Sequence, residues 1–239
     1  MNISIVLPFY NESKRITNIF KPIINLKKKI RNIEFIFVND GSIDSSINLI
    51  NDFIKKNKIK NFKIISYLKN KGKGHALKMG VLNAKYEWIL TSDIDLSVEL
   101  DYFLKWFNLY ELKDNAAYFA SRNNSGSKIK TIFIRKFIGN ILQYLVHIFV
   151  DKNLMDTQCG YKLYNKKYTL KTFKNLSVKG FAHDIELIFL LKKNKIKIIE
   201  LPVIWKHKTN GKINIITDPL IFFIIFFKII LKEYFKKLF

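Results

Sequence analysis

The chain contains few of the residues that staple small folds or interrupt secondary structure. Its 239 residues include one cysteine, Cys159, together with four prolines and nine glycines. A single cysteine cannot form an intramolecular disulfide, which excludes a disulfide scaffold and fits a reducing, cytosolic compartment. Because 49% of the residues are hydrophobic, a disordered chain is also excluded, and the length predicts one domain with a substantial core.

Long apolar runs are missing as well. The C-terminal run at residues 220–227 is far shorter than the roughly 20 apolar residues that a helix needs to cross a bilayer. Before the apolar run at residues 3–7 there is neither a basic segment nor a small-residue cleavage site, so we expect no secretory signal peptide. The sequence therefore predicts neither a membrane-spanning helix nor a secreted protein.

Acidic residues are scarce, with 19 against 42 lysines and arginines and a formal net charge of +23. Such an excess favours an anionic partner, for example an anionic membrane surface, although a lysine-rich composition without functional meaning is the alternative. Nucleic acid is not the expected partner, because the sequence has no helix-turn-helix, zinc or RNA-recognition signature.

The first hundred residues alternate short apolar runs with segments of helical periodicity. This alternation is typical of βαβ units and predicts a Rossmann-like α/β fold around a parallel sheet. In such sheets ligands bind at the carboxyl ends of the strands. The expected strands are residues 3–7, 34–38, 62–67 and 87–92, and the expected helical segments are residues 13–30, 44–57 and 74–84.

The pattern changes near residue 121 without a linker that would separate a second domain. Residues 128–150 predict a helix that is apolar except for one narrow polar stripe, on which Arg135 lies. Such a helix must bury most of its circumference.

A second amphipathic helix is expected at the C-terminus. Asp218 is its predicted N-cap and Pro219 its first residue, followed by the apolar run and then by Lys228 and Lys232. We expect this helix to lie in the plane of a membrane surface with its lysines toward the headgroups, and an ordinary buried helix is the alternative.

Two carboxylates follow the fourth expected strand, at Asp93 and Asp95. If the strand continued, residues two apart would point to the same side. Mg²⁺ and Mn²⁺ prefer oxygen ligands and keep positions open for phosphate, so the pair predicts a site for one of these ions.

Asp40 follows the second expected strand, where a carboxylate can bind a ribose hydroxyl or a base N–H, or can cap the next helix. Lys71 and Lys73 belong to the segment KGKG, which we expect to bring ammonium groups and a permissive backbone near phosphate. This segment is not a P-loop.

Taken together and in order, these segments resemble the inverting family 2 glycosyltransferases with a GT-A fold. Segments in the second half resemble the polyisoprenyl-phosphate sugar transferases, most of all the dolichyl-phosphate β-glucosyltransferase branch. The motifs are VLPFYNE at residues 6–12, VNDGS at 38–42, NKGKG at 70–74, DID at 93–95, SR at 121–122, DTQCGYK at 156–162 and FAHDIEL at 181–187.

The resemblance implies a donor-binding half of about residues 1–120 and an acceptor half of about 121–213, and the expected C-terminal amphipathic helix occupies 214–239. It implies metal ligation by Asp93 and Asp95 and an acceptor phosphate held by Arg122 and Arg135. The implied donor-binding residues are Pro8, Tyr10, Asn11, Glu12, Asp40, Ser42, Lys71, Lys73, Asp93 and Ile94.

The acceptor half carries four more candidate residues. Asp184 and Glu186 are candidates for a catalytic base or for loop organisation, and Asp156 and Gln158 are expected to shape the floor of the active site. A phosphate acceptor is mostly dianionic at neutral pH and needs no strong base, which favours positioning roles for both acidic residues.

The implied reaction is inverting transfer of a hexose, most simply glucose from UDP-glucose, to a polyprenyl or dolichyl phosphate with Mg²⁺ or Mn²⁺. GDP-mannose as donor and a sugar hydroxyl as acceptor are the alternatives, and a hydroxyl acceptor would require a base such as Asp184. We expect a peripheral or monotopic protein on the cytoplasmic side of a membrane. The sequence leaves the oligomeric state and the choice between the two metals open.

Overall fold

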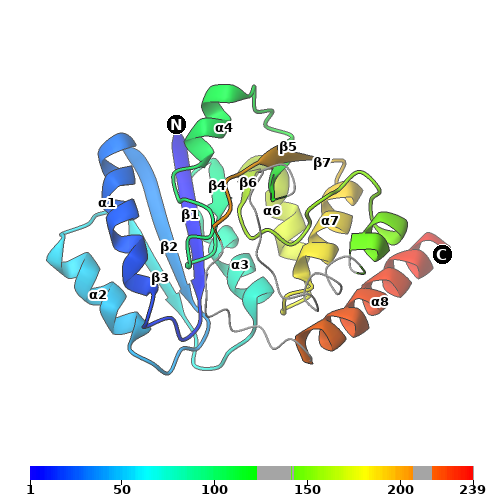
Figure 1. Cartoon of the computed structure of the whole chain (residues 1–239), viewed down its shortest axis with the longest axis horizontal. Coiled ribbons are helices and arrows are strands. Elements are labelled where there is room, and N and C mark those ends of the chain that lie inside the picture. The colour runs from blue at the N-terminus through cyan, green and yellow to red at the C-terminus, as the bar shows by residue number, and fades with distance from the viewer. Residues whose placement is uncertain (123–140, 142, 207–216, 239) are drawn as a thin grey trace.

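A seven-stranded mixed sheet forms the centre of the protein, in a computed structural model that describes residues 1–122, 141, 143–206 and 217–238 (Figure 1). The strand order is β3-β2-β1-β4-β6-β5-β7. The strands are β1 (Asn2–Phe9), β2 (Asn32–Asn39), β3 (Phe62–Ser66), β4 (Trp88–Thr91), β5 (Ala116–Ser121), β6 (Lys162–Asn165) and β7 (Lys197–Pro202).

The first four strands are parallel to one another, as the sequence predicts. β1 pairs with β2 in a register that sets Phe9 opposite Asn39, and β1 pairs with β4 on its other side. β6 runs antiparallel between β4 and β5, and β7 closes the sheet parallel to β5. The predicted Rossmann-like first half is therefore confirmed, and the second half extends the same sheet.

Helices cover both faces of the sheet. One face packs against η1 (Ile16–Ile19), α1 (Phe20–Lys29), α2 (Ser46–Lys56) and α4 (Phe103–Leu109). The other face packs against α3 (Lys73–Leu82), α6 (Lys166–Asn175), α7 (His183–Lys193) and α8 (Thr217–Leu238). Strand periodicity explains the two layers, because Ile5 contributes to the first face and Val6 to the second.

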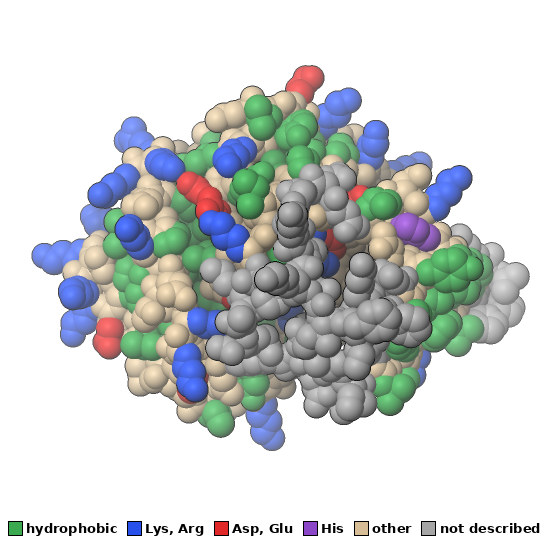
Figure 2. All heavy atoms as spheres, in the orientation of Figure 1, with side chains coloured by type: hydrophobic (Ala, Val, Ile, Leu, Met, Phe, Trp, Pro, Cys, Tyr) green, Lys and Arg blue, Asp and Glu red, His purple; other side chains and the backbone are tan. Residues whose placement is uncertain are grey.

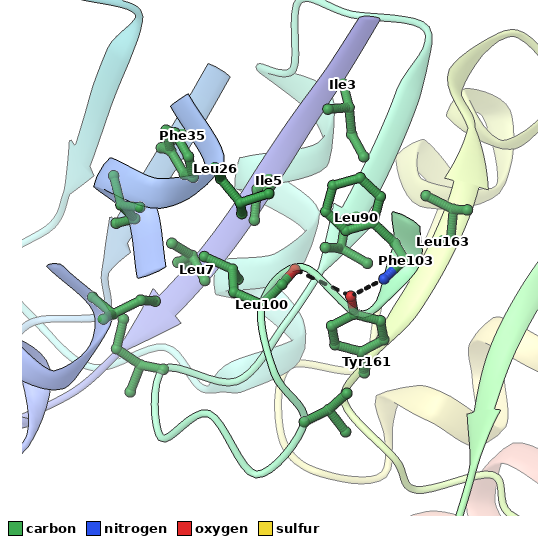
Figure 3. Close-up of a cluster of buried hydrophobic side chains, with 14 of the residues drawn as sticks. Ile3, Ile5, Leu7, Leu26, Phe35, Leu90, Leu100, Phe103, Tyr161 and Leu163 are labelled. Atoms are coloured by element: carbon green, nitrogen blue, oxygen red, sulfur yellow. Dashed lines mark hydrogen bonds between the residues drawn. The ribbon is translucent and has the colours of Figure 1, made fainter. Parts of the chain in front are cut away.

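The core of the first face continues into the active-site loops (Figure 3). Tyr161 is fully enclosed there, and its hydroxyl accepts a hydrogen bond from the backbone N–H of Phe103 at 2.8 Å. The same hydroxyl donates to the carbonyl of Leu100 at 3.2 Å. The hydroxyl thus has both a donor and an acceptor partner, and these two hydrogen bonds hold the loop before β6 against the start of α4.

The structure describes only the last part of the predicted helix over residues 128–150. Residues 143–149 are helical, whereas Arg135 and most of the expected polar stripe lie outside the described residues. The described helical residues end at residue 149, one residue before the predicted end at Val150.

Asp218 lies within the C-terminal helix α8 (Thr217–Leu238), so the prediction of Asp218 as its N-cap is wrong. Pro219 still lies in the first turn, where its missing N–H costs no helical hydrogen bond. One face of α8 packs on the core through Phe226 and Ile229. Within the described residues, no helix is both long enough and apolar enough to cross a membrane.

Candidate active site

The carboxyl ends of β1, β2 and β4 meet at one edge of the sheet. The backbone N–H of Asp40 donates to the carbonyl of Phe9 at 2.9 Å, and that of Ser92 donates to the carbonyl of Val6 at 3.1 Å. These bonds extend the parallel ladders just beyond the strands, and so the three loops that carry the predicted motifs begin side by side.

The loops after β1 and β2 are tied to each other by backbone-to-side-chain hydrogen bonds. Asn11, whose φ is 52°, donates from its N–H to the Ser42 hydroxyl at 2.9 Å, and its side-chain oxygen accepts from the N–H of Ile43 at 2.8 Å. The neighbouring Tyr10 is exposed, and Pro8 is buried within β1. Asn11 and Ser42 therefore shape the loop, while Tyr10 is open to a ligand.

Asp44 fastens the same loop pair to α2. Its carboxylate accepts from the N–H of Ser13 at 2.9 Å and from the N–H of Ser46 at 3.0 Å. Burial opposes ionisation, but the hydrogen bonds from Ser46 and Ser13 outweigh it and lower the pKa of Asp44 to about 2. Asp44, and not Asp40, is thus the acidic residue at the start of α2.

Asp40 holds the loop before α3. One oxygen accepts from the N–H of Lys71 at 2.8 Å, and the other accepts from the N–H of Gly72 at 2.9 Å and from the Asn70 amide at 3.0 Å. Burial raises the pKa of Asp40 despite these donors. The structure gives Asp40 a loop-positioning role beside the predicted nucleotide contact, and it does not cap α2.

The glycines of the KGKG segment serve packing, and the predicted approach of this segment to phosphate stays a prediction. A Cβ on Gly72, which has a φ of 97°, would lie 2.5 Å from the carbonyl oxygen of Lys179. A Cβ on Gly74 would lie 2.5 Å from the Cβ of His183. The N–H of Gly74 already donates to Lys179 at 2.7 Å, so the start of α3 is seated on residues 178–183.

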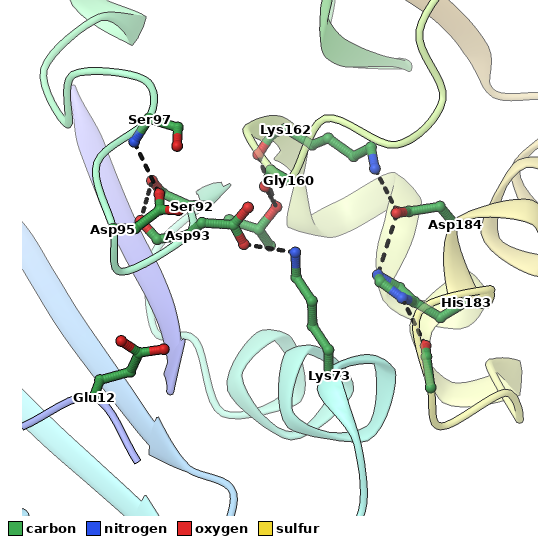
Figure 4. Close-up of polar contacts among 12 residues, drawn as sticks. Glu12, Lys73, Ser92, Asp93, Asp95, Ser97, Gly160, Lys162, His183 and Asp184 are labelled. Atoms are coloured by element: carbon green, nitrogen blue, oxygen red, sulfur yellow. Dashed lines mark hydrogen bonds and ion pairs between the residues drawn. The ribbon is translucent and has the colours of Figure 1, made fainter. Parts of the chain in front are cut away.

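The two carboxylates of the predicted metal site lie in a turn after β4, because the strand ends at Thr91. The condition under which strand geometry would set both carboxylates on one side, a strand continuing through Asp95, is therefore not met. Asp95 accepts from the N–H of Ser97 at 2.9 Å, and Asp93 pairs with Lys73 at 2.6 Å (Figure 4). Ile94 between them is buried in the core, so its side chain does not face the donor as predicted.

Gly160 is a site residue that the sequence analysis did not single out, although its motif was recognised. A Cβ at this position would lie 2.6 Å from both Oδ1 and Cγ of Asp93. Only a glycine leaves room for that carboxylate. The required close approach of a backbone to a functional side chain is decided by the tertiary structure and has no signal in the sequence beyond the glycine itself.

The carboxylate pair offers the oxygen ligands that Mg²⁺ or Mn²⁺ requires. The missing side chain at Gly160 leaves room for the Asp93 carboxylate. In the part of the chain that the structure describes, no three or more His, Cys, Asp and Glu side chains are grouped to hold a metal. Besides carboxylates, such an ion takes water and phosphate oxygens as ligands.

Asp184 lies in a buried network at the start of α7 (Figure 4). Its carboxylate pairs with the Lys162 ammonium and lies 3.2 Å from Nε2 of His183. Burial by itself would raise the pKa of Asp184, but His183, Lys162 and Lys73 outweigh it and hold the pKa below its ordinary value. An ionised carboxylate engaged with a lysine is a weak base, so the geometry favours the positioning role.

Glu186 also organises a loop. Its carboxylate accepts from the N–H groups of Ser177 and Val178, each at 2.7 Å, and from the Ser177 hydroxyl at 2.5 Å. Lys232 of α8 approaches the same carboxylate at 3.7 Å. Of the two roles that the sequence leaves open for Glu186, the structure therefore supports loop organisation rather than catalysis.

Arg122 is held rigidly at the end of β5. Its Nε and Nη2 pair with the two oxygens of Asp156 at 2.6 and 2.8 Å, and its guanidinium lies 5.9 Å from the ring centroid of Trp205. Burial disfavours the charge, but Asp156 raises the pKa of Arg122. The predicted partner Arg135 lies outside the described residues, and Gln158 makes only a 3.5 Å contact with Thr157.

The predicted donor residue Glu12 is buried and paired with Arg15, whose Nη2 lies 2.7 Å from Oε1 of Glu12. The carboxylates of Glu12, Asp95 and Asp93 all raise the pKa of Arg15. Arg15 thus belongs to the charged surroundings of the site. The sequence offered one signal for Arg15, the rarity of arginine, because the chain has only four arginines.

Comparison with solved structures defines the class of protein. The chain is similar to mannosyl-3-phosphoglycerate synthase from Rubrobacter xylanophilus, with a TM-score of 0.67 and 14% identity over 99% of this chain and 75% of that one. It is also similar to glucosyl-3-phosphoglycerate synthase from Mycobacterium tuberculosis in complex with Mn²⁺, UDP and product, with a TM-score of 0.62, 16% identity and coverage of 88% and 73%. These likenesses show the GT-A glycosyltransferase fold.

The sequence itself defines the family. Residues 4–173 match the model of glycosyl transferase family 2, and the chain belongs to that family and is a glycosyltransferase. Its relatives include the dolichyl-phosphate beta-glucosyltransferases of Dictyostelium discoideum and Saccharomyces cerevisiae, each 30% identical. The alignments cover 89% and 91% of this chain and 68% and 71% of those proteins, which confirms the predicted resemblance.

Proposed function

We propose that this protein transfers glucose from UDP-glucose to a polyprenyl or dolichyl phosphate with inversion at the anomeric carbon. The observation that carries the proposal is the carboxylate pair Asp93 and Asp95, which lies close enough to both halves to raise the pKa of Arg15 in the donor half and, through Asp93, that of Arg122 in the acceptor half. The names of the similar proteins support glucose and dolichyl phosphate as substrates.

Asp93 and Asp95 would hold Mg²⁺ or Mn²⁺, and the ion would supply positive charge that stabilises the leaving diphosphate. The similar synthase from Mycobacterium tuberculosis, solved with Mn²⁺ and UDP, supports this assignment. Tyr10 and Glu12, after β1, would contribute to nucleotide binding, as the family motif implies.

The acceptor phosphate oxygen attacks the anomeric carbon while the bond from that carbon to the diphosphate oxygen breaks, and the electron pair leaves with UDP. One displacement converts an α-linked donor into a β-linked lipid-phosphate sugar. A phosphate dianion brings its own nucleophilic charge, so no residue must remove a proton. The engagement of Asp184 with Lys162 agrees with this and speaks against a sugar hydroxyl as acceptor.

Arg122 would align the nucleophile. Asp156 clamps one edge of the guanidinium, and Asp156 is itself fixed because its N–H donates to Glu200 at 2.6 Å. A preoriented guanidinium binds phosphate oxygens in a defined plane, which supports in-line geometry. Arg135 is proposed as the second phosphate ligand on the strength of the family resemblance.

The outer face of α8 supports attachment to a membrane. Opposite the buried face, large apolar side chains are exposed together with Lys228, and Lys232 lies at the border of the two faces, near Glu186. In Figure 2 hydrophobic side chains gather at the right-hand side of the molecule, where α8 and residues 143–149 lie. The exposed apolar residues of α8 are Leu220, Ile221, Ile224, Phe227, Leu231 and Tyr234.

An exposed apolar helix face with lysines beside it suits the interface of an anionic membrane. We therefore place the protein, as a peripheral or monotopic enzyme, at the cytoplasmic surface of the membrane that carries its lipid acceptor. This arrangement combines the two readings of the sequence, because α8 is a packed helix on one face and an interfacial helix on the other.

The transfer reaction is tested with labelled UDP-glucose and, in parallel, labelled GDP-mannose on a short polyprenyl phosphate in detergent. We expect label in the organic phase from UDP-glucose only, dependent on added Mg²⁺ or Mn²⁺. The Asp95→Asn variant should lose at least 100-fold of this activity, and Arg135→Ala should lose less. Label from GDP-mannose alone would overturn the donor, and absence of lipid label with intact UDP-glucose binding would overturn the acceptor.

Membrane attachment is tested by co-sedimentation with vesicles of phosphatidylcholine containing about one third phosphatidylglycerol. Leu231 on α8 is 55% exposed, and Leu68 in the loop before α3 is 98% exposed, so they form a matched pair. Leu231→Asn should lower the bound fraction several-fold, whereas Leu68→Asn should leave it unchanged. Equal binding by both variants would refute attachment through α8.

A further inference from the structure

Lys73 lies where a divalent ion would be expected to lie. Its Nζ is 2.6 Å from Oδ1 of Asp93, and its side chain, 22% exposed, extends from the first turn of α3 to the carboxylate pair (Figure 4). Among the residues that the structure describes, Lys73 is the cation that pairs with Asp93. Asp93 and Asp95 also raise the pKa of Arg15, and Asp93 raises that of Arg122.

The surroundings keep Lys73 charged. Burial disfavours its ammonium, but Asp93, Asp184 and Asp95 outweigh burial, and the pKa of Lys73 is raised. The ammonium therefore neutralises a set of carboxylates that would otherwise repel one another.

The backbone on both sides of the pair is fixed. Gly72 and Gly74 seat the start of α3 on residues 178–183, and Gly160 closes over Asp93. Rotation of the Lys73 side chain is therefore the simplest way for the ammonium to leave Asp93.

An ammonium and a divalent ion compete for this position. A metal ion would bind a carboxylate oxygen at about 2.1 Å, and two cations that share one carboxylate repel each other strongly in a partly buried site. Removal of the ammonium from Asp93 costs free energy unless it finds another anion. The diphosphate of the nucleotide supplies that anion.

We propose that Lys73 is the resident counter-ion of the Asp93–Asp95 pair and moves to the donor diphosphate when metal and nucleotide bind together. This inference rests on the proposed function and assigns regulation to the same site. It makes metal and nucleotide binding mutually dependent, because each removes an obstacle to the other. Metal alone should bind weakly, and UDP should tighten it.

The test measures Mn²⁺ binding by electron paramagnetic resonance, with and without UDP, so that activity is not the readout. Lys73→Met removes the ammonium and keeps an unbranched side chain. Lys69→Met loses the same charge four residues away, at an exposed position with no assigned role in the site, and serves as the control. Thermal unfolding verifies that both variants are folded.

For Mn²⁺ alone, we expect Lys73→Met to lower the dissociation constant at least threefold and Lys69→Met to leave it unchanged. UDP should then tighten Mn²⁺ binding far less in Lys73→Met than in the wild type. Unchanged or weaker Mn²⁺ binding by Lys73→Met, or an equal fall of the dissociation constant in Lys69→Met, would overturn the inference while the proposed metal site stands. Failure of the wild type to bind Mn²⁺ even with UDP would overturn both.

Discussion

The donor half and the acceptor half of this glycosyltransferase hold their polar groups in different ways. After β1 and β2, carboxylate, amide and hydroxyl oxygens accept hydrogen bonds from backbone N–H groups, as Asp40 does from Lys71 and Asp44 does from Ser13. Beyond β5 such bonds recur at Glu186, but ion pairs are added to them, Arg122 with Asp156 and Lys162 with Asp184, and both partners of the second pair are buried. The loops after β1 and β2 thus depend chiefly on backbone N–H groups, and the acceptor region depends also on the neutralisation of a buried charge.

The largest expected effect comes from breaking the buried pair of the acceptor half. Asp184→Asn leaves the Lys162 ammonium without its counter-charge in a buried position, and we expect a loss of about 3–5 kcal/mol of unfolding free energy. Urea denaturation measures this loss. The exposed pair of Asp101 with Lys29 is the control, and Asp101→Asn should cost less than about 1 kcal/mol.

A double variant separates the effect of an uncompensated buried charge from the effect of altered packing. Asp184→Asn combined with Lys162→Met removes both charges, and most of the lost stability should return because no ion is left buried. If the double variant is as unstable as Asp184→Asn, the carboxylate is required for packing and not for charge neutralisation. The two halves would then differ less in how their polar groups are held.

The next effect tests the junction of the two halves. A Cβ at Gly160 would displace the Asp93 carboxylate, so Gly160→Ala should lower sugar transfer about 100-fold, equivalent to about 2.7 kcal/mol of transition-state stabilisation. Gly180→Ala is the matched control, because its Cβ would meet nothing within 4 Å. Similar activity of the two variants would show that the close approach of Gly160 does not position Asp93.

The smallest effect concerns the donor half. Asp44→Ala removes the acceptor for Ser13 and Ser46 and should cost about 1–2 kcal/mol at neutral pH. The folded-state pKa of about 2 lies below the unfolded value, so this stabilisation is present above about pH 4 and disappears as the pH falls toward 2. Urea denaturation at pH 7 and pH 3 measures the change. Asp52→Ala on the exposed side of α2 should show neither effect.

Much of the fold could be predicted because its signals are local. Buried parallel strands are near-continuous apolar runs, and all four strands predicted in the first half were found. The strand ends then identified Asp93 and Asp95 as a pair, since chain order alone places them after β4. The N-cap of α8 was missed because helix ends depend on one or two residues with competing propensities.

The sequence by itself determined the family, the alternation of strands and helices, and the residue types available for nucleotide, metal and phosphate. Only the tertiary structure decided that Ile94 lies in the core, that Lys162 neutralises Asp184, and that Gly160 makes room for Asp93. The physical reason is the separation along the chain over which each interaction acts. Periodicity and strand ends act between near neighbours, whereas a buried charge or a close backbone approach depends on residues that only the folded chain brings together.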